Sequence, residues 1–497
     1  MEQLTWFAKA ARVAEQTAIV DAMGSYTYEQ LQQRARQVAD RLRSSADDLD
    51  ERRVAFLITP GCEYVAAQWG IWQAGGIAVP LGLNHPPPEL AYVIDDADVS
   101  VVIVERRLHD RVAPIAAERS LPVIAVDSLA ETPPRDKLPK IDSTRRAMIL
   151  YTSGSTGKPK GVVTTHANIQ AQIDALVDAW EWRETDRILH VLPMHHIHGI
   201  INVLSCAMQV SAVCEFMPFH PTNVWERLAR GDLTLFMAVP TIYAKLISEF
   251  DRASAQQQQA WSAGARRMRL MVSGSAALPV PTLEKWEALT GQRLLERYGM
   301  TEIGMALSNP LQGTRRPGHV GRPLPQVEIR RTNERGEIVD DATPGEIEVR
   351  GPNVFLEYWR RPEATRKSFR DGWFRTGDVA VVDNGAYRIL GRSSVDIIKT
   401  GGYKVSALEI EDVLRTHSAI KDCAVVGVAD DEWGECVAVC VVLEDNTTLS
   451  LAALRAWGKQ QLAPYKVPTL LYICDDLPRN VMGKVQKPQV RTLFAQH

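Results

Sequence analysis

One loop carries the densest set of groups that could bind phosphate. It runs from Tyr151 to Gly161 and reads Tyr-Thr-Ser-Gly-Ser-Thr-Gly-Lys-Pro-Lys-Gly, after an apolar run and before an amphipathic stretch. Glycines let a backbone approach a ligand closely and present its amides, and the hydroxyls and lysines add donors and positive charge. A Walker A loop needs a glycine five residues before its Gly-Lys pair and a hydroxyl residue after it, whereas here Pro159 follows Lys158.

The loop therefore predicts a polyphosphate site of another kind, and the alternative is a polar surface turn. The residues predicted to bind the phosphates are Thr152, Ser153, Gly154, Ser155, Thr156, Gly157, Lys158 and Lys160.

The elements that must position this loop alternate between short apolar runs and longer amphipathic stretches. Tyr28–Ser44 and Asn168–Trp180 have apolar residues at helical spacing. Strand–helix alternation is typical of α/β architecture with largely parallel sheets. The runs predicted as buried strands are Val54–Ile58, Ile77–Leu81, Val101–Val104, Val123–Val126, Met148–Tyr151, Ile188–Leu192, Leu235–Ala238 and Leu270–Ser273.

Two changes in composition and apolar pattern divide the rest of the chain. From about Gln312, Gly and Pro become frequent and the apolar residues alternate, which predicts a small β-rich module. After the segment Gly391–Asp396, strand and helix patterns alternate over about 100 residues, the size of one small α+β domain. We expect an N-terminal domain at 1–391, a hinge at 392–396 and a C-terminal domain at 397–497. Gln256–Gln259 is interpreted as a solvated loop.

Composition narrows the function class. The 497 residues carry a formal net charge of −3 and are 45% hydrophobic and 24% charged. This is ordinary for a globular protein and excludes a disordered chain, a collagen-like repeat and a coiled coil. The charge argues against a nucleic-acid partner, and no apolar run reaches the ~18–20 residues of a membrane helix.

Cysteine usage bears on the compartment. The seven cysteines are scattered and form no Cys-x-x-Cys motif, which indicates free thiols in a reducing compartment. The N-terminus lacks a basic-then-apolar signal layout. We expect a cytoplasmic protein, with a weak transit segment as the alternative.

The phosphate loop resembles the AMP-binding signature of the adenylate-forming superfamily, which includes acyl-CoA synthetases, firefly-type luciferases and the adenylation domains of peptide synthetases. Further similar motifs follow in the family's order along nearly the whole chain, and such an ordered set is highly specific. These motifs are Leu192–Gly199, Ser273–Ala277, Tyr298–Glu302, Trp373–Asp378, Gly391-Arg392, Lys399–Tyr403 and Pro478–Lys484.

The resemblance implies an α/β fold with a large N-terminal domain, made of two α/β subdomains and a small β-rich one, and a small mobile α+β C-terminal domain. It implies two reactions. ATP and a carboxylate give acyl-AMP and pyrophosphate, and a thiol, usually CoA, then displaces AMP. ATP, Mg²⁺, CoA and a small carboxylate are the implied partners, with no nucleic acid or membrane, for a monomer or homodimer.

Catalytic roles come with the resemblance. Lys484 would bridge the carboxylate and the α-phosphate, where positive charge stabilises the developing charge. Glu302 would bind Mg²⁺, a hard cation that prefers oxygen, with Thr156 as a further ligand and Thr301 near the phosphates. The pivot of the hinge is Asp396 or Ser394, because the spacing from Arg392 to Lys399 is one residue longer than in many relatives.

Nucleotide and thiol contacts are implied in the same way. Asp378 accepts hydrogen bonds when ionised and suits the ribose diol, with Arg392 assisting it. Tyr298 offers a ring face to adenine. The other residues assigned to the nucleotide are Gly274, Ser275, Ala276, Ala277, Glu296, Gly299 and Met300, and those assigned to CoA are Lys399, Gly401, Gly402 and Tyr403.

In the segments Val239–Tyr243, Leu295–Glu302 and Arg350–Phe355, the chain most resembles the malonyl-CoA synthetases within the superfamily. Arg297 stands just before the Tyr-Gly pair, where related ligases often have glycine in the acyl pocket. Its forked donors match a carboxylate, and malonate has a second carboxylate that needs a partner. An ion pair of Arg297 with Glu296 or another acidic neighbour is the alternative. The other residues assigned to the acyl substrate are His196, His198, Lys245 and Ser273.

The sequence thus predicts an ATP-dependent malonate–CoA ligase, with methylmalonate as a further candidate substrate. Three alternatives stay open: a short- or medium-chain acyl-CoA synthetase, an adenylating enzyme that loads a carrier protein in trans, and a nucleotide-binding sensor without catalysis. A transition metal held by His195, His196 and His198 is not expected.

Overall fold

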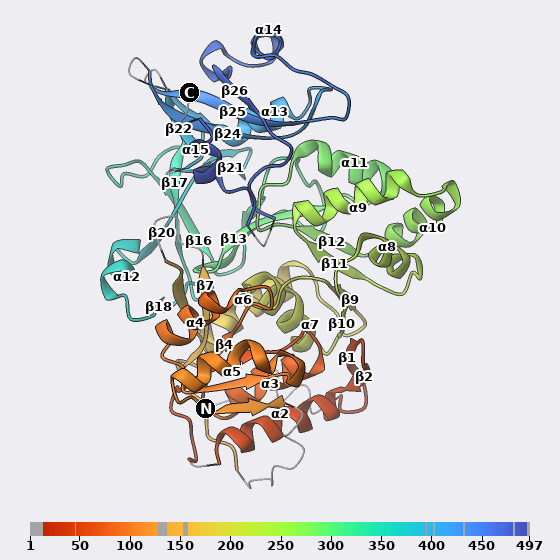
Figure 1. The fold of residues 1–497 in the computed structure, drawn as a ribbon, viewed down its shortest axis with the longest axis vertical. Helices are drawn as coiled ribbons and strands as arrows, with labels where there is room; N and C mark the ends of the chain where they lie inside the picture. Colours follow the sequence, from red (N-terminus) through yellow and green to blue (C-terminus); the bar gives the residue numbers. More distant parts are fainter. Residues whose placement is uncertain are drawn as a thin grey trace.

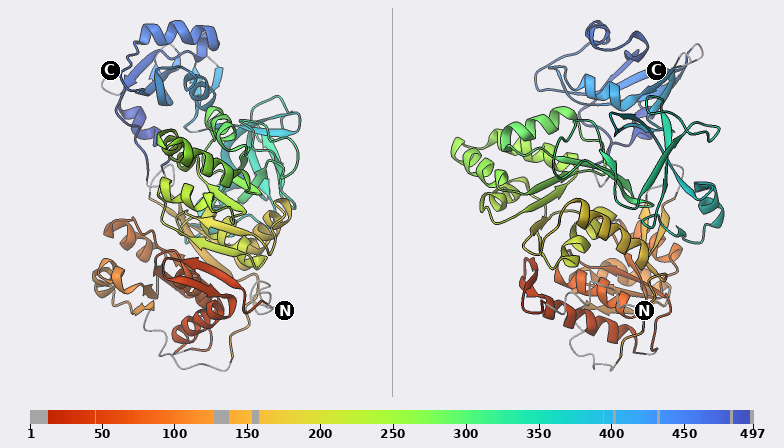
Figure 2. Two further views of the ribbon diagram at one scale, coloured as in Figure 1. Left: turned by 90° about the vertical axis from the view of Figure 1, so that its right-hand side faces the viewer. Right: turned by 180° about the vertical axis from the view of Figure 1, so that it is seen from behind.

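The computed structural model describes residues 13–44, 46–126, 137–152, 158–393, 395–400, 403–430, 433–480 and 483–494. The first of four sheets lies toward one end of the long axis of the molecule and the fourth at the other end, and the second and third lie between them, partly side by side (Figures 1 and 2). The first two belong to α/β layers, the third is small and antiparallel, and the fourth belongs to a C-terminal domain at one end. This is the predicted α/β class with a small α+β C-terminal domain.

The first sheet has seven strands in the order β18-β8-β7-β4-β3-β5-β6. Its apolar strands β3, β4, β5 and β6 pair in parallel, and β7 and β8 form an antiparallel hairpin. The phosphate loop connects these two strands. The bounds are β3 Arg53–Leu57, β4 Ile77–Pro80, β5 Val101–Val104, β6 Val123–Ala125, β7 Arg146–Thr152, β8 Lys160–Thr165 and β18 Glu357–Tyr358.

The second sheet has nine strands in the order β15-β14-β13-β12-β11-β9-β10-β1-β2. Strands β11, β12 and β13 lie side by side in parallel, so their carboxyl ends meet at one edge. The bounds are β1 Thr17–Asp21, β2 Gly24–Thr27, β9 Arg187–His190, β10 Val213–Phe216, β11 Leu235–Ala238, β12 Leu270–Ser273, β13 Leu295–Met300, β14 Gly304–Ser308 and β15 Arg322–Pro323.

Helices cover both sheets, and most of them bury the one side on which their apolar residues recur, whereas α3 is buried on nearly all sides. In α2, for example, Leu31, Ala35, Val38 and Leu42 are buried, and Thr27 caps its first turn. The bounds are α2 Tyr28–Leu42, α3 Cys62–Gln73, α4 Pro87–Asp96, α5 His109–Glu118, α6 His166–Ala179, α7 Cys206–Gln209, α8 Pro221–Ala229, α9 Pro240–Arg252, α10 Ala255–Arg266 and α11 Val280–Thr290.

The interpretation of Gln256–Gln259 as a loop was wrong, since these residues form the first turns of α10. Ser254 accepts from the backbone of Gln257, whose side chain bonds back to Ser254. This capping box satisfies the open amides of the first turn, and glutamine is a good helix former.

The third sheet is the predicted β-rich module, and β20 is its longest strand. In it β17 pairs with β16 and β20, and β20 also pairs with β19 and β21. Helix α12 precedes β19 in the chain. The bounds are β16 Glu328–Thr332, β17 Gly345–Arg350, α12 Pro362–Ser368, β19 Phe369–Arg370, β20 Trp373–Asp383 and β21 Ala386–Arg392.

The fourth sheet forms the C-terminal domain with its own core around Val425, Val439 and Leu454. The predicted hinge lies between the end of β21 and the start of β22. The predicted Gly401-Gly402 turn lies outside the described residues. The bounds are β22 Ile397–Thr400, β23 Tyr403–Ser406, α13 Ala407–Leu414, β24 Ile420–Asp430, β25 Gly434–Leu443, α14 Leu451–Gln461, β26 Leu470–Ile473 and α15 Lys487–Thr492.

Candidate active site

The carboxyl ends of the adjacent strands β12 and β13 bring two predicted segments together. The chain leaves β12 into Gly274–Ala277, and β13 turns back into β14 at Thr301-Glu302. This turn requires glycine: a Cβ on Gly299 would lie 2.1 Å from the Gly304 carbonyl oxygen. Ligands of α/β sheets bind at this end of the strands, so the topology supports a site here.

Glu302 is buried at this turn, and the Tyr358 hydroxyl donates to its Oε1 at 2.9 Å. Burial raises the pKa of Glu302, and the Tyr358 hydrogen bond opposes the rise. No group of three or more His, Cys, Asp or Glu side chains in the described chain could hold a metal. A single carboxylate fits Mg²⁺, which binds through one or two carboxylates together with substrate phosphates.

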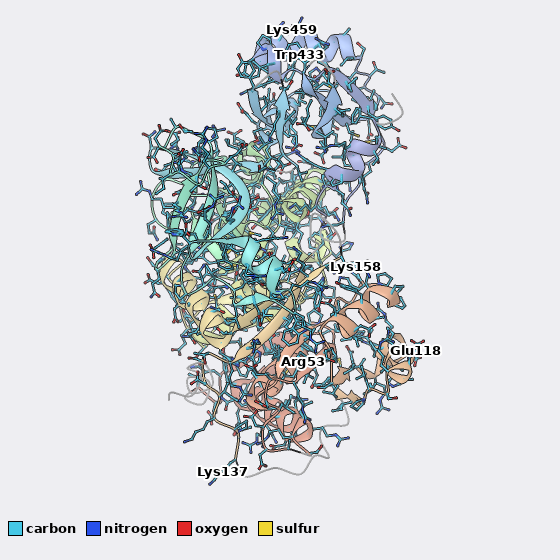
Figure 3. All side chains as sticks on the ribbon, turned by 90° about the vertical axis from the view of Figure 1, so that its left-hand side faces the viewer. Arg53, Glu118, Lys137, Lys158, Trp433 and Lys459 are labelled. Atoms are coloured by element: carbon cyan, nitrogen blue, oxygen red, sulfur yellow. The ribbon has the colours of Figure 1, made fainter. Side chains whose placement is uncertain are left out.

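The stem of the phosphate loop lies next to Glu302. Thr152 and Lys160 face each other across the β7–β8 hairpin, and the Lys160 ammonium lies 4.9 Å from the centroid of the Tyr358 ring. Lys158, labelled in Figure 3, is exposed, with its ammonium 5.6 Å from the centroid of the Tyr92 ring. The predicted residues Ser153, Gly154, Ser155, Thr156 and Gly157 lie outside the described residues.

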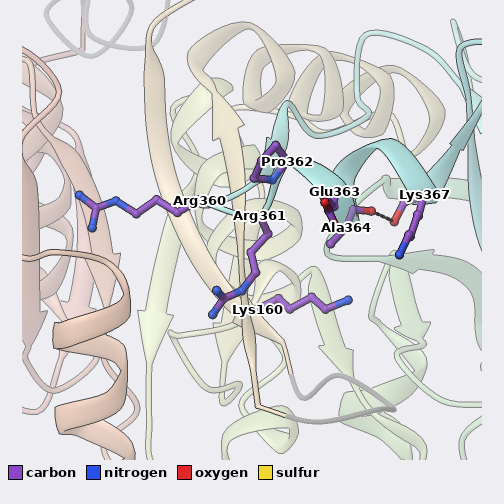
Figure 4. A pocket seen from close by; sticks show the side chains of 8 residues that line it. Lys160, Arg360, Arg361, Pro362, Glu363, Ala364 and Lys367 are labelled. Carbon is purple, nitrogen blue, oxygen red and sulfur yellow. Dashed lines mark hydrogen bonds between the residues drawn. The ribbon is translucent and has the colours of Figure 1, made fainter.

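Lys160 also lines a pocket of about 510 Å³ beside α12, shown in Figure 4. Arg360 and Arg361 line it as well, and they pair with Asp98 and Asp96 at 2.6 Å. The pocket is lined by cationic side chains, but the charges of Arg360 and Arg361 are compensated by these ion pairs.

Asp378 is the centre of a hydrogen-bonded cluster on β20. Tyr298 donates to its Oδ2 at 2.6 Å, and Arg392 donates to its Oδ1 at 3.1 Å. The Thr376 hydroxyl accepts from the Asp378 amide at 3.0 Å. Three strands thus fix the carboxylate, which suits the predicted contact with ribose.

Lys484 reaches this cluster from the C-terminal domain. Figure 1 shows the segment before α15 running down from that domain to the start of α9. At its tip Gly483 has φ +76°, and a Cβ there would lie 3.0 Å from Thr241 Oγ1. Solvent still reaches Lys484, yet the surrounding protein and then Arg392 lower the pKa of its ammonium, while Asp378 raises it.

Arg297 is buried on β13 and packs against Gly274, where a Cβ would lie 2.5 Å from the guanidinium carbon. One nitrogen donates to Ser275 Oγ at 3.4 Å, and Nε has no partner. Among the described residues, no carboxylate lies within ion-pair distance of it. Burial lowers the pKa of Arg297 to about 9. A buried cation without a counter-ion is costly, so the geometry fits an anionic ligand.

Glu296 does not provide that counter-ion, because neighbouring residues on a strand point to opposite faces. Its Oε1 accepts from the Leu278 amide at 3.0 Å, and burial raises its pKa to about 8. The alternative of an Arg297–Glu296 ion pair is therefore not realised. Glu296 holds the segment just before α11, and its assignment to the nucleotide stays a prediction.

The histidine segment lies on the other side of Ser275. His198 begins a π-helix, η3 (His198–Ser205), and its Nδ1 lies 3.2 Å from Ser275 Oγ. Burial and then Arg297 hold the pKa of His198 well below its usual value, so the ring is neutral. Its Nε2 and the buried Ser273 hydroxyl have no partner in the described structure. Burial also lowers the pKa of the adjacent His196, to about 4.

Other predicted residues are not brought to this cluster. Lys245 is exposed one helical turn beyond Thr241 on α9. Lys399 and Tyr403 are exposed on the C-terminal sheet, where the Tyr403 ring stacks on that of Tyr465 at 4.2 Å. Gly401 and Gly402 lie outside the described residues. The roles assigned to these five residues stay predictions.

Sequence reasoning missed two contacts that build the site. Tyr358 bonds to Glu302 across 56 positions of sequence, and Thr241 receives the Lys484 loop. Tyr358 stands in the run Tyr-Trp-Arg-Arg-Pro-Glu-Ala-Thr, which lies outside the motifs that carry the family resemblance.

The linker between the domains is held by Asp396. Its Oδ2 accepts from the Arg392 amide at 3.0 Å, and its Oδ1 pairs with Lys487 at 2.6 Å. Ser394, the other candidate pivot, lies outside the described residues.

Comparison with known proteins agrees with this arrangement. Residues 6–359 match the AMP-binding enzyme family, and residues 409–484 match the AMP-binding enzyme C-terminal domain. A mitochondrial malonate–CoA ligase of Mus musculus is 46% identical over 97% of this chain and 89% of its own.

Two solved structures of MatB from Rhodopseudomonas palustris are also similar. The ATP-bound structure has a TM-score of 0.90 at 34% identity and covers 99% of both chains. The apo structure has a TM-score of 0.82 at 35% identity, with the same coverage. The whole fold therefore superposes better on the ATP-bound arrangement.

Proposed function

The chain belongs to the AMP-binding enzyme family, and on that basis we propose that it is an ATP-dependent malonate–CoA ligase. The observation that carries the choice of acid is the buried Arg297 guanidinium, which has no carboxylate within ion-pair distance in the described part of the chain. The similarity of the chain to a malonate–CoA ligase of Mus musculus also supports malonate as the acid.

In the first reaction one malonate carboxylate attacks the α-phosphorus of ATP, and pyrophosphate leaves. Lys484 stabilises the negative charge that develops between carboxylate and phosphate. Asp378 and Arg392 hold the ribose, and Lys160 contacts the leaving phosphates. Glu302 would hold Mg²⁺, which would supply positive charge to screen the phosphates.

The second malonate carboxylate does not react. Arg297 and Ser275 bind it, while the neutral His198 beside them adds no charge. In the second reaction the CoA sulfur attacks the acyl carbonyl and AMP leaves. The smallest branched analogue, methylmalonate, keeps both carboxylates and is the second proposed substrate.

We propose a cytoplasmic location because all seven cysteines are free thiols. Among the described residues, no helix has the length and apolar character that a membrane span requires.

The decisive experiment is a pyrophosphate-release assay with acetate, malonate, methylmalonate, butyrate and octanoate, each with and without CoA. The proposal expects release with malonate above all, and thioester only when CoA is present. A preference for butyrate or octanoate would identify a short- or medium-chain synthetase. If malonate gives pyrophosphate release but no thioester forms when CoA is added, the enzyme that loads a carrier protein would be favoured. If no acid gives pyrophosphate release, the nucleotide-binding sensor would be favoured.

A further inference from the structure

The C-terminal domain meets the linker through a buried cluster of charges that catalysis does not use directly. Lys487, the first residue of α15, is buried, and its ammonium pairs with Asp396 Oδ1 at 2.6 Å and Glu411 Oε1 at 2.8 Å. Glu411 is itself buried on α13 and accepts from the Val425 amide at 2.8 Å. One end of the cluster is therefore fixed in the core of the C-terminal domain.

The other end reaches the nucleotide cluster. The two oxygens of Asp396 are divided between the domains: Oδ1 pairs with Lys487, and Oδ2 accepts from the amide of Arg392, the last residue of β21. The Arg392 side chain in turn donates to Asp378. The linker has little freedom here, because Gly391 has φ +117° and a Cβ there would lie 2.3 Å from the Asp396 Cβ.

Lys487 is also three residues after Lys484 in the same segment. Lys484 is anchored by Asn480, whose side-chain oxygen accepts from the Lys484 amide at 3.0 Å. The ion pairs of Lys487 thus fix the base of the loop whose tip presents Lys484. Lys487 pairs with one carboxylate on the linker and with another in the core of the C-terminal domain. The two pairs together fix the orientation of the linker relative to the domain as well as the distance between them.

We propose that Lys487 is a positioning residue for adenylation: through Asp396 it holds the linker and the C-terminal domain in the arrangement that presents Lys484 to the nucleotide. This inference rests on the proposed role of Lys484. Lys487 lies outside the proposed substrate contacts, so its effect is confined to adenylation, the reaction that needs Lys484. The second reaction, which starts from preformed acyl-AMP, is unchanged.

The test compares the two reactions in Lys487→Gln, Lys487→Arg and Asp396→Asn. Adenylation is measured by malonate-dependent pyrophosphate release, and the second reaction by malonyl-CoA formation from supplied malonyl-AMP and CoA. We expect Lys487→Gln and Asp396→Asn to slow adenylation about 10–100-fold through kcat, with KM for ATP within about threefold. The second reaction should stay within about twofold of wild type, and Lys487→Arg should restore adenylation to within about fivefold.

Lys466→Gln is the matched control, because Lys466 pairs with Glu409 on the same helix α13 at 2.6 Å but does not reach the linker. It should leave both reactions unchanged. Hydrogen–deuterium exchange gives a second readout: the Arg392 amide, which donates to Asp396, should exchange faster in Lys487→Gln and at the wild-type rate in Lys466→Gln.

Equal losses in both reactions, in a variant that keeps the wild-type melting temperature, would overturn the inference by making Lys487 a general structural support. So would full adenylation activity in Lys487→Gln. Lys484→Ala separates this failure from that of the proposed function. If Lys484→Ala abolishes adenylation while Lys487→Gln does not affect it, only the inference fails; if Lys484→Ala adenylates normally, both fail.

Discussion

At the scale of single residues, the proposed preference for malonate depends on a guanidinium that the protein buries but does not neutralise. Arg297 has Ser275 Oγ as its hydrogen-bond acceptor and no carboxylate within ion-pair distance among the described residues. A malonate carboxylate supplies that partner, whereas a fatty acyl chain would leave the charge facing hydrocarbon.

Arg297→Ala should therefore change selectivity more than nucleotide binding. We expect kcat/KM for malonate to fall roughly 10²–10³-fold, as for loss of one partner of a desolvated charge pair worth ~3–4 kcal/mol. Butyrate should lose much less or improve. The measurements are kcat/KM for both acids and KM for ATP; a parallel fall for both acids with weaker ATP binding would contradict the assignment.

Tyr358 should set the acid limit of the Mg²⁺ site proposed at Glu302. Burial raises the pKa of Glu302 and the Tyr358 hydrogen bond lowers it, so deleting the hydroxyl should raise that pKa further. As the pH falls through this pKa, Glu302 gains a proton and loses the charge that attracts Mg²⁺. We expect Tyr358→Phe to move the acid limb of the Mg²⁺-dependent rate to higher pH. An acid limb at the wild-type pH would refute this role.

At the scale of elements, the turn after β12 controls the position of Arg297. The backbone of Gly274 does not have a positive φ, so its conformation does not require glycine. A Cβ added at this position would nevertheless lie 2.5 Å from the carbon of the Arg297 guanidinium and collide with it. The flexible arginine must then move, so we expect Gly274→Ala to lower kcat/KM for malonate roughly 10–100-fold and to lower that for butyrate less.

Gly458→Ala is a matched control for this substitution, because a Cβ at Gly458 on α14 would meet Val467 at an ordinary 3.4 Å. It should leave the ratio of malonate to butyrate unchanged. A crystal structure of Gly274→Ala with Arg297 in its original place and normal selectivity would rule out the mechanism.

Sequence patterns located most elements but few of their contacts. The apolar runs of β3, β5, β11 and β12 were placed within a residue or two, because strands buried on both faces are continuously apolar. The hairpin of β1 and β2 was missed, since it joins the second sheet beside β10, almost two hundred positions away.

In the candidate site, too, the sequence indicated the residues but not their contacts. The ordered motifs that resemble the adenylate-forming superfamily were sufficient to propose Lys484, Glu302, Asp378 and Arg297. The contacts of Tyr358 with Glu302 and of Gly274 with Arg297 arise only when separate strands pack together, and no local pattern encodes them. The helix at Gln256–Gln259 was missed because polar composition outweighed the capping signal of Ser254.

At the scale of the whole molecule, the proposed role of Lys484 makes the first reaction depend on the C-terminal domain. The charges of Asp378 and Arg392 act on the Lys484 ammonium, and the adjacent Gly483 lies against Thr241 at the start of α9. The predicted CoA residues Lys399 and Tyr403 meanwhile face solvent. The two reactions should therefore respond to opposite substitutions.

We expect Lys484→Ala to slow acyl-AMP formation at least ~10²–10³-fold and to spare thioester formation from supplied malonyl-AMP. Gly402→Leu should do the reverse: ATP–pyrophosphate exchange with malonate persists, while a leucine side chain obstructs the approach of the thiol. Equal loss of both reactions in either folded variant would mean that its role is misassigned.

The buried guanidinium also has a consequence for the lifetime of the protein. Burying an uncompensated charge lowers the free energy of unfolding, and replacing it with an apolar side chain of similar volume often raises that free energy. Arg297→Met should accordingly melt at a higher temperature than the wild type when no acid is present, while it loses malonate activity. Malonate should stabilise the wild type in proportion to ln(1 + [malonate]/Kd) and leave Arg297→Met unaffected. If Arg297 binds malonate as proposed, resistance to heat and proteolysis depends on substrate supply, so that a cell short of malonate would hold an enzyme that unfolds and is degraded more readily.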